Sequence, residues 1–238
     1  MIYVTGEFHG VFDPLYKFSQ SKEGKSLTKS DYVIALGDFG VWPQTINAIK
    51  KLNENLNFTL LFLEGNHEHY LFLDTFPTRQ MFGGKVHDVF GIYHLCRSEI
   101  YSFLVGSKKI TIAVCGGGDS RDKAKRTEGV DWFAQEKILR SDVTSLLEKA
   151  KNYGMKVDYF LSHSLSAAVK IEWNYEYECC RFLAIPSCEL LESDFMIRDI
   201  AGVLEAKKYL SAHEHIDRNF LLCGKEYCSV YRNFVKLC

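Results

Sequence analysis

In the segment FTLLFLEGNHE, residues 58–68, a largely apolar run ends at Leu63, and Glu64, Gly65 and a cluster of polar side chains follow it. Two other apolar runs, 2–5 and 31–36, end at a glycine that an acidic residue follows. Such strands, apolar along their whole length and stopped by glycine, are typical of a sheet that is covered on both faces. Between two of them, residues 45–56 have the apolar spacing of a helix. The first third of the chain therefore predicts a β-α-β arrangement.

The remainder of the chain continues the alternation of strands and helices. We expect strands at 86–93, 100–105, 109–115 and 157–161, and a closing β-hairpin within 220–238. Helical regions are expected at 190–206 and at 130–151, the latter broken near Ser141-Asp142, which is a good N-cap pair. Gly106-Ser107 is the expected turn between two of these strands. Residues 164–188 interleave aromatic and acidic side chains, and we interpret them as a loop or cap over the site. Because no repeat, low-complexity tract or linker interrupts the sequence, residues 1–238 are expected to form a single domain.

The composition disfavours some partners. The chain has 238 residues, 47% of them hydrophobic, which suits a globular protein with a substantial core. Its 29 basic and 30 acidic residues give a formal net charge of −1, so no global charge attracts nucleic acid or an anionic membrane. The sequence shows neither a signal peptide nor the ~18 consecutive apolar residues of a membrane span. We therefore expect a cytoplasmic protein without a membrane partner, whose eight cysteines are reduced.

Acidic, amide and histidine side chains gather where the apolar runs end. They are Glu7, His9, Asp38, Asn66, His67, His163, His213 and His215. Residues i and i+2 of an extended segment point to one side, so Glu7 with His9, and His213 with His215, can each converge on one ion. Taken singly, each cluster is more often a turn or a hydrogen-bonded loop. Five of the eight histidines nevertheless lie in these clusters, which favours a shared divalent-metal site over unrelated turns.

In their order and spacing, these clusters resemble the motifs of the calcineurin-like metallophosphoesterases. That family has D-x-H, G-D, G-N-H-[ED], a lone H and G-H-x-H, and the resemblance extends from residue 2 to about residue 216. Residues 116–136 further resemble a small bacterial and phage branch of the family. The sequence departs from the pattern twice, because Glu7 replaces the usual Asp and Ala212 replaces the first Gly of the last motif.

The resemblance implies an α/β (α+β) fold, in which two sheets form a β-sandwich flanked by helices and the site lies at the carboxyl ends of strands. It also implies two divalent metal ions, for which Mn²⁺, Fe, Zn²⁺ and Ni²⁺ suit the nitrogen and oxygen donors present. The implied ligands are Glu7, His9, Asp38 and His215 for the first ion, and Asp38, Asn66, His163 and His213 for the second.

The implied activity is hydrolysis of a phosphomonoester or phosphodiester in a small phosphorylated substrate. A hydroxide shared by the two metals would attack phosphorus, while the cations neutralise the developing charge. Asp38 would act on both metals, and His67 would protonate the leaving group or bind a phosphate oxygen. Arg121 and Arg126 could reach the substrate anion, although a solvated charged loop is an equally good interpretation of that segment.

Two other functions stay open at the level of sequence. A metal-dependent DNA or RNA nuclease would share these motifs, but the balanced charge makes nucleic acid a less favoured partner. A non-catalytic binding module with a degenerate site is the other, and Glu7 is the only feature that favours it. Residues 39–42, which follow Asp38, argue against a protein phosphatase, because they lack the Asp-Arg-Gly of that branch. The sequence does not indicate whether the chain self-associates.

Overall fold

Two β-sheets face each other across a shared apolar interior in the computed structural model, which describes residues 1–179 and 188–238. Within these residues, the first sheet has seven strands in the order β13-β1-β2-β3-β6-β5-β4. They are β1 Ile2–Thr5, β2 Tyr32–Ala35, β3 Thr59–Phe62, β4 Thr78–Met81, β5 Gly84–Val89, β6 Ile92–Leu95 and β13 Phe234–Lys236. Because β1, β2, β3 and β6 run parallel, their carboxyl ends lie at one edge of the sheet.

The second sheet has six strands in the same described parts of the chain, in the order β11-β12-β10-β9-β8-β7. They are β7 Glu99–Val105, β8 Lys108–Cys115, β9 Lys156–Ser162, β10 Glu205–Ser211, β11 Arg218–Leu222 and β12 Lys225–Ser229. The four strands β8, β9, β10 and β12 are parallel, so the carboxyl ends of β9 and β10 are neighbours.

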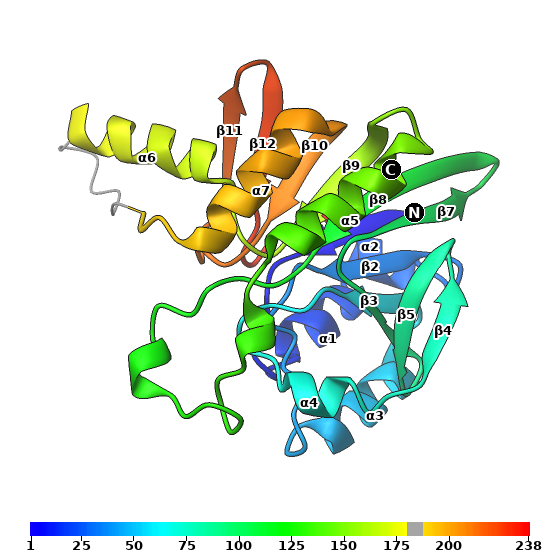
Figure 1. Ribbon diagram of the computed structural model, residues 1–238. Helices are drawn as coiled ribbons and strands as arrows, with labels where there is room; N and C mark the ends of the chain where they lie inside the picture. The colour runs from blue at the N-terminus through cyan, green and yellow to red at the C-terminus, as the bar shows by residue number, and fades with distance from the viewer. Residues whose placement is uncertain (180–187) are drawn as a thin grey trace.

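Helices cover the outer face of each sheet (Figure 1). The helices α1 Asp13–Gln20 and α3 Ile46–Asn55 pack on the seven-stranded sheet, whereas α5 Arg140–Lys151 and α7 Glu192–Val203 pack on the six-stranded sheet. The shorter helices are α2 Lys22–Lys25, α4 Tyr70–Leu73 and two 3₁₀ turns, Lys123–Lys125 and Ala134–Glu136. The remaining described helix, α6 Ala167–Cys179, packs beside α7 and extends outward from the body (Figure 1).

Burial on both faces explains why the strands are apolar along their whole length. In β2, Val33 and Ala35 belong to the layer that contains Ile49 of α3, whereas Ile34 lies in the interior between the two sheets. Successive strand residues point to opposite faces, so each of them meets a buried layer whichever way it points. The predicted fold, two sheets flanked by helices, is therefore confirmed. Because both sheets share one interior, we propose that they fold as one domain.

The expected strand 86–93 is wrong, because it is two strands. β5 and β6 meet at a two-residue turn formed by Phe90 and Gly91, whose φ angles of 55° and 82° are the left-handed values of a type I′ hairpin. Phe90 directly precedes Gly91, so the Asn or Asp that usually signals such a turn is missing. The pattern of apolar residues therefore predicted one strand where the structure has two. The turn at Gly106-Ser107 lies between β7 and β8 as expected.

Three further boundaries also differ from the expectation. The helical region expected over 130–151, with a break near Ser141-Asp142, is α-helical only over Arg140–Lys151; the Asp142 carboxylate accepts the Leu139 N–H at 2.8 Å and caps the helix close to the expected break. Within 164–188, expected as a loop or cap, Ala167–Cys179 is helix α6, and residues 180–187 lie outside the described residues. Within 220–238, β11 and β12 form a hairpin, and β13 pairs with β1 of the other sheet.

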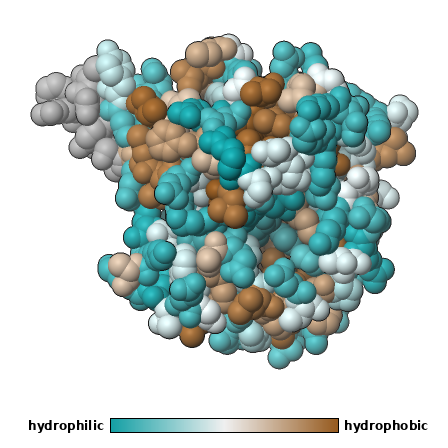
Figure 2. Space-filling model, viewed as in Figure 1, coloured by the Kyte–Doolittle hydropathy of each residue, from teal (hydrophilic) through white to brown (hydrophobic). Residues whose placement is uncertain are grey.

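The surface carries its apolar side chains in small groups. On the face shown in Figure 2, these groups are separated by polar residues. Leu104 on β7 and Leu221 on β11 are among the exposed large apolar residues, and they lie on different strands. Scattered exposed apolar residues of this kind are normal on folded proteins. Among the described residues, no helix combines the length and the apolar character needed to cross a membrane.

The interior between the sheets generates a first prediction. Leu61 on β3 is fully buried there, whereas Leu221 is 74% exposed. We expect Leu61→Ala to lower the free energy of unfolding by about 3 kcal/mol, because the change leaves a cavity between two sheets that cannot collapse freely. Urea unfolding followed by circular dichroism measures the change. The matched variant Leu221→Ala should stay within about 0.5 kcal/mol of the wild type, and equal losses for both variants would contradict the described packing.

Candidate metal centre

The carboxyl ends of five strands, three from one sheet and two from the other, meet at one place. The predicted site residues follow these strands: Glu7 and His9 after β1, Asp38 after β2, Asn66 and His67 after β3, His163 after β9, and His213 and His215 after β10. Asp38 Oδ2 lies 3.6 Å from His163 Nε2 and 3.8 Å from His9 Nε2, so its carboxylate faces imidazoles from both sheets. The structure therefore brings the predicted side chains into one cluster.

An open pocket lies over this cluster. It is lined by Asp38, Asn66, His67, Arg121, Asp122, His213, Glu214 and His215. His9 stands beside it, with its ring centroid 5.2 Å from that of His67 and 5.9 Å from that of His215. Glu7 is buried below the surface of the cluster. A solute that enters the pocket would thus meet imidazole, carboxylate and amide groups on one floor.

Four of the clustered residues hold an uncommon backbone conformation. His9, Asp38, His213 and His215 have φ angles of 50°, 43°, 66° and 52°. Residues other than glycine rarely adopt these left-handed values, which cost about 1–3 kcal/mol each and tend to occur at functional sites. Because four such residues lie in one cluster, the interactions that hold their side chains in place must outweigh the cost of the uncommon backbone conformation.

The orientation of His163 is fixed by the backbone of the neighbouring sheet. Its Nδ1 lies 2.8 Å from the carbonyl oxygen of Leu36, which can only accept a hydrogen bond, so Nδ1 carries the proton. Its Nε2 then presents a lone pair to Asn66 Oδ1 at 3.0 Å and to Asp38 Oδ2 at 3.6 Å. Three acceptor atoms therefore face one another, which a shared cation would stabilise. A ring nitrogen that donates to a backbone carbonyl is also the usual partner arrangement of a metal-binding histidine.

Asn66 is turned toward the same point by its own hydrogen bonds. Its Nδ2 donates to Ser120 Oγ at 3.1 Å, which leaves Oδ1 directed at His163. Ser120 Oγ also accepts from Arg126 Nη1 at 2.7 Å and donates to Glu136 Oε2 at 2.8 Å. The amide of Asn66 is thus held with its oxygen, a hard metal ligand, facing the cluster.

Glu7, which stands where the resembling family has Asp, reaches the cluster from the other side. Its Oε1 lies 2.6 Å from His215 Nε2, and this carboxylate raises the pKa of His215. Its Oε2 has no hydrogen-bond donor among the described residues, and the buried Nε2 of His213 likewise has no partner there. Burial lowers the pKa of His213 well below its usual value, so the imidazole is neutral and its lone pair is free. Unpartnered buried acceptors of this kind fit a bound cation.

Glu7 is the residue common to two groups of closely spaced ligand atoms, and Asp38 belongs to one of these groups. The ligand atoms of Glu7, Asp38 and His163 lie within 4.8 Å of one another, as do those of Glu7, His9 and His215. Burial acts to raise the pKa of Asp38, but the imidazoles of His163, of His67 and of His9 lower it, so the carboxylate is ionised. Its Oδ1 accepts the backbone N–H of His67 at 2.7 Å. The extra methylene of Glu7 therefore still allows its carboxylate to reach the groups around Asp38.

Glu68 holds the loop that follows Asp38. Its Oε1 accepts the N–H of Phe39 at 2.6 Å, its Oε2 accepts the N–H of Val41 at 2.8 Å, and both oxygens lie 3.2 Å from the N–H of Gly40. Burial and the negative charge of Asp38 raise the pKa of Glu68 to about 8, against the effect of these donors. Glu68 thus orients the cluster without belonging to it.

The two arginines predicted to bind substrate have different surroundings. Arg121 lines the pocket, and its Nη2 lies 2.6 Å from Glu214 Oε2. The side chain of Arg126 is only 8% exposed and bonds to Ser120, behind Asn66. The structure therefore places Arg121 at the pocket, whereas Arg126 acts on the site through Ser120.

One residue that the sequence analysis did not single out is Lys170 of α6. Its side chain is fully buried, and its Nζ lies 2.6 Å from Glu214 Oε1 and 2.8 Å from Asp194 Oδ2 of α7. Since Glu214 stands between two histidines of the cluster, this ion pair ties their loop to both helices. The signal in the sequence was a lysine within the apolar stretch 167–171. Breaking such a buried pair typically costs about 3–5 kcal/mol.

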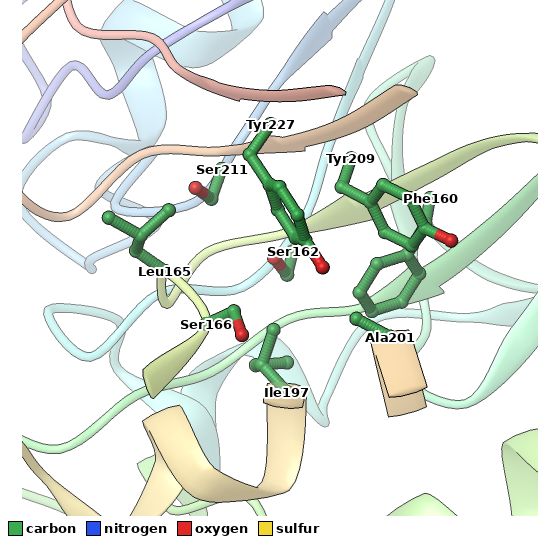
Figure 3. A pocket seen from close by; sticks show the side chains of 9 residues that line it. All are labelled: Phe160, Ser162, Leu165, Ser166, Ile197, Ala201, Tyr209, Ser211 and Tyr227. Carbon is green, nitrogen blue, oxygen red and sulfur yellow. The ribbon is translucent and has the colours of Figure 1, made fainter. Parts of the chain in front are cut away.

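A second, smaller cavity lies between the six-stranded sheet and α7 (Figure 3). It is lined by Phe160, Ser162, Leu165, Ser166, Ile197, Ala201, Tyr209, Ser211 and Tyr227. The buried hydroxyls of Ser166 and Ser211 have no partner among the described residues. With room for about one water molecule, the cavity suits bound solvent and is too small for a substrate. The pocket over the histidine cluster is therefore the candidate site.

This chain is similar to a protein family and to solved structures of other proteins. A family model described as calcineurin-like phosphoesterase matches residues 1–217. A putative 5′-nucleotidase from Staphylococcus aureus, solved with alpha-ketoglutarate, has a TM-score of 0.55 at 12% identity, over 97% of this chain and 48% of that chain. This chain therefore spans about half the length of that protein. The phosphopantetheinyl hydrolase of Mycobacterium tuberculosis has a TM-score of 0.48 at 14% identity, over 97% and 89%. No curated protein matches the sequence.

The close approach of backbone to Asp38 generates a prediction for Gly65. A Cβ at this position would overlap the amide nitrogen and the carboxylate of Asp38, whereas a Cβ on Gly202 of α7 would meet nothing within 4 Å. We expect Gly65→Ala to weaken Mn²⁺ binding about 10–100-fold, because Asp38 must move away from its imidazole neighbours. Isothermal titration calorimetry measures the affinity. Gly202→Ala should bind Mn²⁺ as the wild type does, and an unchanged affinity in Gly65→Ala would contradict the described cluster.

Proposed function

The chain belongs to the calcineurin-like phosphoesterase family, whose members are metal-dependent hydrolases, and we propose that it hydrolyses a phosphomonoester or phosphodiester of a small substrate at the strand-end cluster. The observation that carries this proposal is the convergence of acceptor atoms with no proton between them. His163 Nε2 lies 3.0 Å from Asn66 Oδ1 and 3.6 Å from Asp38 Oδ2. A bound cation makes such an arrangement of acceptor atoms favourable.

The donor set divides into two groups around Asp38. One divalent ion would be held by Glu7, His9, Asp38 and His215, and a second by Asp38, Asn66, His163 and His213. The convergence of Glu7, His9 and His215 supports the first group, and the contacts of His163 with Asn66 and Asp38 support the second. All these donors are nitrogen or oxygen, which suits Mn²⁺, Fe, Zn²⁺ or Ni²⁺. When bound, such a pair acidifies water to give the nucleophile and neutralises the phosphoryl oxygens.

His67 stands on the floor of the pocket and would meet the phosphoryl group directly. Burial lowers its pKa, and the nearby charge of Asp38 only partly offsets this, so the imidazole is neutral near pH 7. A neutral imidazole can donate one N–H to a phosphate oxygen, whereas it has no spare proton for a leaving group. Its backbone is fixed on both sides, since its N–H bonds Asp38 and its carbonyl oxygen accepts Trp42 Nε1–H at 3.0 Å. We therefore assign His67 to binding of the phosphoryl oxygen.

The charges at the pocket support a small substrate. Arg121 is the one Lys or Arg side chain among the lining residues, and its guanidinium pairs with Glu214, while Asp122 adds a second carboxylate to the lining. A polyanion would meet these carboxylates, and the net charge of −1 offers no long-range attraction to it. A compact phosphate ester presents one anionic group, which Arg121 and the bound cations can neutralise. This favours a small phosphorylated molecule over nucleic acid.

Asp38 provides the test of the proposed reaction. We expect Asp38→Asn to lower kcat/KM for an aryl phosphate or a bis-aryl phosphodiester by more than about 10³-fold, because one change disturbs both cations. Hydrolysis with added Mn²⁺ is measured by the released phenolate. Asp13→Asn, which alters an exposed carboxylate in the first turn of α1, should leave the rate unchanged. Near-wild-type turnover in Asp38→Asn would sink the assignment.

A second test separates the two roles of His67. If His67 only binds a phosphoryl oxygen, His67→Ala should lower kcat/KM by a similar factor, about 10²-fold, for an aryl and for an alkyl phosphate. If it protonated the leaving group, the loss would be much larger for the alkyl ester, whose alkoxide needs the proton more. Comparing the two substrates with the same variant preparation removes differences in folding. A selective loss on the alkyl phosphate would overturn the binding role.

A further inference from the structure

A second group of metal-type side chains lies away from the pocket, on the hairpin of β5 and β6. His87 on β5 and His94 on β6 are paired in register across the two strands, and Cys96 follows β6 directly. The ligand atoms of all three residues lie within 4.8 Å of one another. Both histidines are buried, and Cys96 is half-buried. The neighbouring strand β3 leads to the catalytic cluster, but none of the three residues belongs to that cluster.

The spacing of these atoms matches a tetrahedral site. His87 Nδ1 and His94 Nδ1 are 3.0 Å apart, and Cys96 Sγ is 3.9 Å from His87 Nδ1. Zinc binds imidazole nitrogen at about 2.0–2.1 Å and thiolate sulfur at about 2.3 Å, which puts two nitrogens ~3.3 Å apart and a nitrogen and a sulfur ~3.6 Å apart. Shifts of a few tenths of an ångström would bring all three atoms to bonding distance.

The orientation of His94 is already set for binding. Its Nε2 lies 2.7 Å from Glu64 Oε2, so Nε2–H donates to the carboxylate and the Nδ1 lone pair points at His87. Glu64 is itself held, because its Oε1 accepts Arg97 Nε–H at 2.9 Å. A carboxylate that fixes the outer nitrogen of a ligating histidine is the recurrent support of protein zinc sites. Glu64 is not one of the three clustered residues, so its contact with His94 is a separate observation in favour of a metal site.

We propose that His87 Nδ1, His94 Nδ1 and Cys96 Sγ bind a zinc ion in a site separate from the catalytic cluster. The two nitrogens and one thiolate select a borderline-soft cation such as Zn²⁺ over Mn²⁺ or Mg²⁺. Binding releases the thiol proton of Cys96 to solvent and moves the imidazole proton of His87 from Nδ1 to Nε2. Three protein donors leave the fourth tetrahedral position to a solvent molecule.

This site would act on the catalytic end of the sheet through Glu64. Glu64 directly precedes Gly65 and Asn66, and its backbone oxygen accepts the N–H of Gly117 at 2.7 Å. An ion on His94 would hold the Glu64 carboxylate in place and with it the end of β3. The ion would therefore stabilise the strand end that carries Asn66, without touching substrate.

Cobalt(II) gives a readout that the catalytic cluster cannot produce. None of the residues proposed to hold the catalytic cations has a sulfur atom, so a thiolate-to-cobalt charge-transfer band in the near ultraviolet reports the Cys96 site alone. We expect this band when Co²⁺ is added to the full-length, chelator-treated protein, and we expect Zn²⁺ in excess over all three proposed cation sites to abolish it. Cys96→Ser should lack the band. His87→Gln should lower the affinity of the site for Co²⁺ at least about tenfold.

The matched control is Cys228→Ser, which removes another half-buried thiol and should keep the full band. Circular dichroism of each variant checks that it is folded. Absence of the band in the wild type, or its persistence in Cys96→Ser, would overturn the proposal. Because phosphoesterase activity with Mn²⁺ is measured separately, failure of the zinc site and failure of the proposed function are distinguishable.

Discussion

The hydrogen bond from His163 Nδ1 to the carbonyl oxygen of Leu36 is the contact on which the candidate site depends. It joins the end of a strand in one sheet to the end of a strand in the other, at 2.8 Å. By fixing the proton on Nδ1, it leaves Nε2 as an acceptor that faces Asn66 Oδ1 and Asp38 Oδ2. Mutually facing acceptors are unfavourable in a buried space unless a cation lies between them. The packing of the two sheets therefore prepares the chemistry, since it decides which atoms face each other.

Buried acidic side chains hold the loops of the cluster from behind. Glu68 accepts backbone N–H groups of the loop after Asp38, and Glu214 is paired with the fully buried Lys170. Glu64 is paired with Arg97 and His94 at the end of β3, and these partners lower its pKa to about 2 although burial opposes ionisation. An acidic side chain is costly to bury without hydrogen-bond donors or a positive partner. Each of these side chains is therefore held together with its donors in a defined geometry. Glu68 thereby fixes the loop that follows Asp38, and the Lys170 pair of Glu214 fixes the loop that carries His213 and His215.

Local patterns in the sequence predicted the parts of the structure that depend on local rules. Apolar runs stopped by glycine located β1, β2 and β3, and the polar residues after them lie together as expected, while their role as metal ligands stays a prediction. The hairpin turn at Phe90-Gly91 was missed because Phe90 stands where Asn or Asp would signal a two-residue turn. The pairing of β13 with β1 joins the two ends of the chain, and no local pattern encodes a partner so distant. Lys170 was overlooked for the same reason, since its two carboxylate partners come from α7 and the loop after β10.

A crystal structure of the full chain grown with Mn²⁺, with anomalous diffraction recorded to locate the metal, shows directly whether the cluster binds two cations. We expect two anomalous peaks that share Asp38, one beside Glu7, His9 and His215 and the other beside Asn66, His163 and His213. Both peaks should be bounded by nitrogen and oxygen atoms alone. A structure in which these residues enclose no anomalous peak at saturating Mn²⁺, while the side chains keep their described positions, would contradict this expectation.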